Sequence, residues 1–228
     1  MSYLHHCYLV LARHRYKLLL GSLLLLVLGS GFTPATADPR LFAVLLLQNL
    51  AVGVLVFLEE RPWLLLACFG AVLALEGAAQ VWGWVTVRGY TGLAYSFFCF
   101  IVTLRIFRKV LGTGRVTTEL LAATMCGFVL LGMVGTFLFV IIDLAQPGAF
   151  ANVVPGATSV QPLNYFSFIT LLTVGYGDIV PTTNLARKAV MLLGLLGHFY
   201  DVFVISVIVS KYVGSTVEKA EESSARQP

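Results

Sequence analysis

A short segment late in the chain has the residue types needed to hold a cation stripped of its water. It reads Thr170-Leu171-Leu172-Thr173-Val174-Gly175-Tyr176-Gly177-Asp178. Removing the water shell of a monovalent cation requires closely spaced oxygens that replace the lost water. Because glycine adopts backbone angles that are closed to other residues, Gly175 and Gly177 allow successive carbonyl oxygens to face one axis. The segment therefore predicts a cation-coordinating loop built from main-chain oxygens.

The same segment closely resembles the selectivity filter of the potassium-channel pore family, in which a Thr, two residues and a second Thr precede Val-Gly-Tyr-Gly-Asp. The resemblance implies a filter of five residues: Thr173, Val174, Gly175, Tyr176 and Gly177. It implies that K+ is held by the carbonyl oxygens of the first four, with the Thr173 hydroxyl as the innermost ring. A glycine-containing turn in a membrane enzyme is the alternative, but turn chemistry alone does not require the whole string.

The resemblance also implies a set of supporting residues around the filter. Tyr165 and Phe166 match an aromatic cuff, Thr170 opens the motif, and Tyr165 is placed to hydrogen-bond Asp178. Two positions depart from the family pattern, because Leu172 stands where many members have a second Thr and Ile169 where some have a Glu. We expect selectivity to survive both departures, which bear instead on filter inactivation.

The composition indicates a membrane protein. The 228 residues are 58% hydrophobic and 11% charged, and the mean hydropathy is +0.89, which is too apolar for a water-soluble fold. The net charge of +4 arises from small basic clusters at the ends of apolar runs, so no nucleic-acid partner is expected. The four cysteines lie in or beside apolar runs without metal-ligand spacing. We expect no enzyme activity and no cofactor, with K+ only as the permeant ion.

Six apolar runs are long enough to cross a bilayer, at about 17–32, 41–58, 63–85, 91–107, 118–142 and 186–212. A shorter run at about 163–173 fits a re-entrant helix, which is tolerated where it is buried or lines water. The predicted fold is therefore an all-α membrane protein with six transmembrane helices, a re-entrant pore helix and a filter loop. The first run also resembles a signal peptide, with Ala35-Thr36-Ala37 as a cleavage-like site.

Basic residues set the expected orientation. With the amino terminus inside, eleven of the 15 Lys and Arg residues fall on the cytoplasmic side and four outside. We therefore expect a multi-pass protein of the cell membrane with both termini cytoplasmic. The predicted domains are 1–115, an amino-terminal tail and charge-poor, voltage-sensor-like four-helix domain; 116–213, a pore domain; and 214–228, a short cytoplasmic tail.

One filter loop supplies only a quarter of a ring, so the partners expected for this chain are three identical subunits in a homotetramer, with membrane lipid around them. Gly197 follows Gly177 by 20 residues and matches the hinge glycine of the pore-lining helix. Its alternative role is close helix packing.

Asp201 stands in an otherwise apolar run, where an ionisable group is expensive unless it faces water or a partner. The stretch around it resembles the inward-rectifier potassium channels, which implies that Asp201 binds internal polyamines or Mg2+. The alternatives are a paired or a protonated carboxyl group. His198 shares much of one helical face with Asp201 and either titrates near neutrality or packs as a neutral side chain.

We expect weak or absent voltage gating, although four spans before a pore resemble the voltage-gated superfamily. Arg105, Arg108 and Lys109 look like the inner end of a sensor helix, but residues 91–103 contain no Arg or Lys, and a sensor needs several cations within the field. Glu76 has no evident partner. The alternatives are a truly voltage-gated potassium channel and, more remotely, a membrane enzyme or scaffold.

Overall fold

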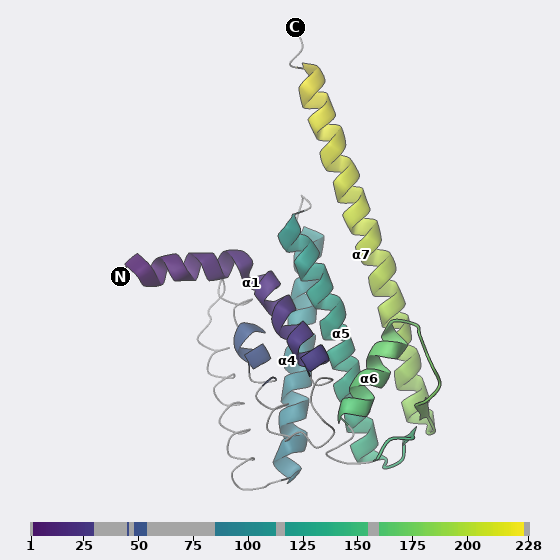
Figure 1. Ribbon diagram of the computed structural model, residues 1–228. Coiled ribbons are helices and arrows are strands. Elements are labelled where there is room, and N and C mark those ends of the chain that lie inside the picture. Colours follow the sequence, from purple (N-terminus) through teal and green to yellow (C-terminus); the bar gives the residue numbers. More distant parts are fainter. Residues whose placement is uncertain are drawn as a thin grey trace.

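The computed structural model describes residues 2–29, 45, 48–53, 85–112, 117–154 and 160–225. Almost all of them are helical, in α1 (Ser2–Gly29), α4 (Val85–Gly112), α5 (Thr118–Ala145), α6 (Val160–Leu171) and α7 (Asn184–Ala225). Two short strands, β1 (Phe150–Ala151) and β2 (Val180–Pro181), pair antiparallel. Figure 1 shows the short helix α6 held between α5 and α7. The described residues therefore agree with an all-α fold.

Helix α5 is the centre of the packing, because it contacts α1, α4, α6 and α7. One apolar core lies between α1, α4 and α5 and includes Leu23, Cys99 and Met133. A second core lies between α5, α6 and α7 and includes Phe139 and Leu193. The chain thus places its amino-terminal helices and its filter segment on different sides of one shared helix.

A buried polar network joins the amino-terminal helices. The side-chain amide of Asn49 donates to the Ser22 hydroxyl at 3.0 Å. The hydroxyl of Tyr95 donates to the Asn49 side-chain oxygen at 2.7 Å. Buried polar groups of this kind are stable only when they have such partners, so the network pins α1, the 48–53 segment and α4 in one arrangement.

The helix bounds agree with some predicted spans and correct others. Helix α5 and residues Asn184–Lys211 of α7 are long and apolar enough to cross a membrane, and they match the predicted runs at about 118–142 and 186–212. Helix α1 begins at Ser2 rather than near residue 17, and α4 covers more than the predicted 91–107. The runs at about 41–58 and 63–85 lie mostly outside the described residues, as does Glu76.

At the carboxyl-terminal end of the chain, α7 continues to Ala225. Residues 214–225 contain no proline and include Ala, Glu and Lys, which are good helix formers. The predicted cytoplasmic tail over 214–228 is therefore helical as far as Ala225. In Figure 1 this end of α7 extends well beyond the other helices.

Candidate functional site

The loop that carries the filter motif begins as the carboxyl-terminal cap of α6. The N–H of Val174 donates to the carbonyl oxygen of Ile169 at 2.8 Å, and the N–H of Thr173 donates to that of Thr170 at 3.1 Å. Thr173 has a φ of 58°, so these bonds form the Schellman arrangement that often ends a helix. Glycine normally occupies the left-handed position, and a threonine there costs about 1–2 kcal/mol.

These bonds decide where the first carbonyls of the loop point. A trans peptide directs its N–H and its C=O in opposite directions, and the described residues contain no cis peptide bond. The N–H groups of Val174 and Gly175 face the carbonyl oxygen of Ile169, at 2.8 and 3.3 Å. The carbonyls of the same two peptides belong to Thr173 and Val174, and they therefore point away from α6.

The sign of the backbone angle φ then alternates from residue to residue along the loop. Thr173, Gly175 and Gly177 have φ values of 58°, 53° and 81°, whereas Val174 and Tyr176 do not have positive φ. In such alternating backbone the N–H groups gather on one side, which leaves successive carbonyls on the other. The Thr173 and Val174 carbonyls, which point away from α6, are followed by this alternating backbone.

Helix α6 is positioned by a close contact with α5. The Ser167 hydroxyl donates to the Gly132 carbonyl at 2.7 Å, and a Cβ added at Gly135 would lie 2.5 Å from the Ser167 oxygen. Thr136 donates to the same Gly132 carbonyl at 2.9 Å. Sequence reasoning missed these residues, and the signal that could have found them is the close spacing of two glycines in an apolar helix.

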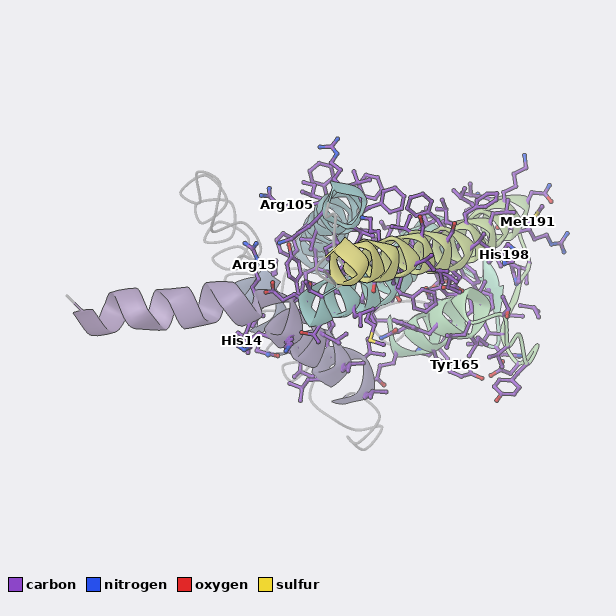
Figure 2. The ribbon with its side chains drawn as sticks, turned by 90° about the horizontal axis from the view of Figure 1, so that it is seen from above. His14, Arg15, Arg105, Tyr165, Met191 and His198 are labelled. Atoms are coloured by element: carbon purple, nitrogen blue, oxygen red, sulfur yellow. The ribbon has the colours of Figure 1, made fainter. Side chains whose placement is uncertain are left out.

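The two predicted cuff residues face different ways. Phe166 is buried behind the loop, with its ring centroid 5.3 Å from that of Phe139 and 5.6 Å from that of Phe150. Tyr165 is 41% exposed, and its hydroxyl group forms a hydrogen bond with the Asp178 side chain. Tyr165 also lies far from two basic residues of the amino-terminal helices, Arg15 and Arg105 (Figure 2).

The outer end of the loop is held by the segment that follows α5. The Asn152 side-chain amide donates to the Asp178 carbonyl at 2.7 Å, and Asn152 itself has a φ of 63°. Next to it, Phe150 and Ala151 pair with Pro181 and Val180. Sequence reasoning missed the support that Asn152 and the β1–β2 pair give to the loop. A two-residue strand and one left-handed asparagine leave no periodic pattern.

Helix α7 approaches the end of α6 at Gly197. A Cβ there would lie 2.6 Å from the side chain of Leu171, the last residue of α6. The Tyr200 hydroxyl donates to the Thr124 carbonyl of α5 at 2.5 Å. His198 and Asp201 are exposed, so the structure brings the two together on the side of α7 that the described helices leave open.

The basic residues of α4 lie away from the filter. Lys109 has its ammonium nitrogen 4.6 Å from the centre of the Tyr16 ring of α1, Arg108 is exposed, and Arg105 is half-buried. The same end of α4 contacts α7, because the Lys211 ammonium donates to the Val110 carbonyl and the rings of Phe107 and Phe203 lie 4.8 Å apart. This contact joins α4 to the middle of α7, at Phe203 and Lys211.

Two comparisons with known proteins each match part of the chain. Residues 129–213, from the middle of α5 to α7, match the Ion_trans_2 family, which is described as an ion channel. The chain is also 30% identical over 112 residues to "Two pore potassium channel b" of Oryza sativa subsp. japonica, an alignment covering 48% of this chain and 28% of that relative. No solved structure matches the chain.

The matched segment contains α6, the filter motif and the membrane-length part of α7. With the two apolar helices, it makes the chain a membrane protein. The match supports a channel rather than an enzyme, and an ion channel of this family needs no cofactor. The chain spans only 28% of the length of its curated relative.

Proposed function

We propose that the chain is one subunit of a homotetrameric, potassium-selective channel that conducts K+ passively. The observation that carries this proposal is the direction of the Thr173 and Val174 carbonyls, which point away from α6 and are followed by a backbone of alternating φ sign. Potassium selectivity requires rings of such oxygens in place of the hydration shell. The name of the rice relative refers to potassium, and this supports the same ion for the present chain.

Fourfold assembly is supported by surfaces that a single chain leaves uncovered. Tyr176 of the filter motif is 74% exposed, and Met191, Phe199 and Ile205 of α7 are each more than 60% exposed. One chain supplies one row of carbonyls, whereas a cation must be surrounded, and closed rings of identical subunits meet that need. We infer that three further copies of this chain cover the filter segment and part of α7.

The remaining topology follows from the same proposal. Six membrane spans, a multi-pass arrangement in the cell membrane and two cytoplasmic termini agree with the distribution of basic residues. The contacts between α4 and α7 connect α4 physically to the helix that we infer lines the pore. The lack of Arg and Lys over 91–103 favours a pore with weak or no voltage gating, and true voltage gating is the second candidate.

The test of the proposed function is planar-bilayer recording of the purified full chain in a K+-to-Na+ gradient. A reversal potential near that of potassium is the expected result. A current that does not distinguish K+ from Na+, or no current at any voltage, would contradict the proposal. Steps of voltage in the same recording distinguish a weakly gated pore from a voltage-gated one.

We predict that internal spermine blocks outward K+ current in a voltage-dependent way and that Asp201→Asn weakens this block by about tenfold or more. Four carboxylates in a cavity of low dielectric constant concentrate cations strongly, and the exposed position of Asp201 on α7 is compatible with such a ring. The measurement is spermine dose–response at fixed voltage. Unchanged block in Asp201→Asn would remove Asp201 from the pore.

We predict that Asn152→Gly and Asn152→Ala both shorten the time for which current is sustained. Each variant loses the hydrogen bond to the Asp178 carbonyl, which is worth about 0.5–1.5 kcal/mol, and the outer filter then relaxes more easily. Glycine accepts the φ of 63° without strain, so the alanine variant should also be less stable. Long recordings at constant voltage measure the decay. If the current of Asn152→Gly decays at the same rate as the current of the unmodified chain, the hydrogen bond from Asn152 does not support the filter.

A further inference from the structure

His198 and Asp201 form a pair of metal-ligating side chains on the open face of α7. Both are exposed, whereas their neighbours Gly197 and Tyr200 are buried. Asp201 is the third residue after His198 in a continuous helix. The two side chains therefore lie on one face, about 4.5 Å apart along the axis. Gly197 contacts Leu171 of α6 and Tyr200 contacts Thr124 of α5, and these two contacts set the rotation of α7.

The same contacts set the depth of the pair. Gly197 touches Leu171, and the filter motif starts two residues after Leu171. His198 therefore lies next to the inner end of the filter, and Asp201 lies about one turn further in. Gly194 precedes His198 by about one turn, and a Cβ at Gly194 would meet nothing within 4 Å. Among the described residues of one chain, no neighbouring atom therefore fills the turn of α7 between His198 and the filter.

We propose that the His198 imidazoles of the four subunits, with the Asp201 carboxylates one turn further in, bind a first-row transition-metal dication in the cavity beneath the filter. The inference rests on the proposed fourfold pore. In the described part of one chain, no group of three or more His, Cys, Asp and Glu side chains could hold a metal, so the site is complete only when partner copies contribute.

Symmetry indicates which metal fits. Four equivalent nitrogens around a fourfold axis lie in one plane, which is the arrangement that Ni2+ and Cu2+ prefer, whereas Zn2+ prefers a tetrahedron. Mg2+ is a hard cation that takes oxygen ligands and keeps its waters. The carboxylates of Asp201 attract any of these cations, but only coordination by His198 favours Ni2+. A comparison of Ni2+ with Mg2+ therefore separates coordination from simple attraction.

The experiment applies Ni2+ or Mg2+ from the internal side to the full chain in planar bilayers, after purification with a tag that contains no histidine. We expect Ni2+ block to weaken at least tenfold in His198→Ala and His198→Gln, with Mg2+ block unchanged. We expect Asp201→Asn to weaken block by both metals. His5, His6 and His14 remain in every variant, so binding at the amino terminus does not respond to the change.

Equal Ni2+ block in the unmodified chain and both His198 variants would overturn the proposal, and so would a parallel loss of Ni2+ and Mg2+ block. If neither variant conducts, Ni2+ titration of purified protein decides: the unmodified chain must bind one more Ni2+ per four chains than His198→Gln. Equal stoichiometry would also overturn the site. Absence of K+ current in the unmodified chain counts against the proposed function, and the titration still tests the metal site.

Discussion

Substitution of Gly175 by alanine should abolish selective K+ conduction. Gly175 has a φ of 53°, and an L-residue in this left-handed conformation costs about 1–2 kcal/mol. In a tetramer the penalty applies four times at one ring. We expect the strained peptide at residue 175 to rotate, so that its carbonyl oxygen no longer faces the bound cation. The reversal potential in a K+-to-Na+ gradient should move from near the potassium value towards zero, or the current should disappear.

The matched control for this prediction is Gly194→Ala. Gly194 and Gly175 both have nothing within 4 Å of an added Cβ, so neither substitution creates a clash inside one chain. Gly194 is helical and has no positive φ, so its alanine variant should keep the potassium reversal potential. Normal selectivity in Gly175→Ala would show that the left-handed backbone is not needed for the filter.

Gly135→Ala should destabilise the folded protein by about 1–3 kcal/mol, because overpacking forces side chains and backbone apart. The added Cβ would lie 2.5 Å from both the Ser167 hydroxyl oxygen and a methyl carbon of Leu193. These contacts belong to α6 and α7, so both helices must move away from α5. The Ser167 hydrogen bond to Gly132 would be weakened as well. The midpoint of thermal unfolding should fall by roughly 2–12 °C.

Gly21→Ala is the control for this prediction. Gly21 is exposed on α1, and an added Cβ would meet nothing within 4 Å. Alanine favours a helix over glycine by about 1 kcal/mol, so this variant should unfold at the same or a higher temperature. If Gly135→Ala unfolds as late as Gly21→Ala, then α5 and α6 do not pack as closely as the structure shows.

The amino-acid sequence by itself determined the class of the protein and the chemistry of its central segment. An apolar composition with basic clusters can be stable only in a bilayer, and this indicated a membrane protein. The motif from Thr173 to Gly177 indicated main-chain coordination of a cation, because two glycines at alternate positions permit a left-handed backbone. The predicted runs that became α5 and α7 were also readable, since an apolar run of membrane length is a local property.

Only the tertiary structure decided how the segment is held. The carbonyls of Thr173 and Val174 point away from α6 because the N–H groups of the same two peptides face the Ile169 carbonyl, and the sequence does not state that pairing. Ser167 meets Gly132 across 35 residues, and Tyr200 meets Thr124 across 76. Partners so far apart depend on how whole helices pack, which no local pattern of residue types encodes.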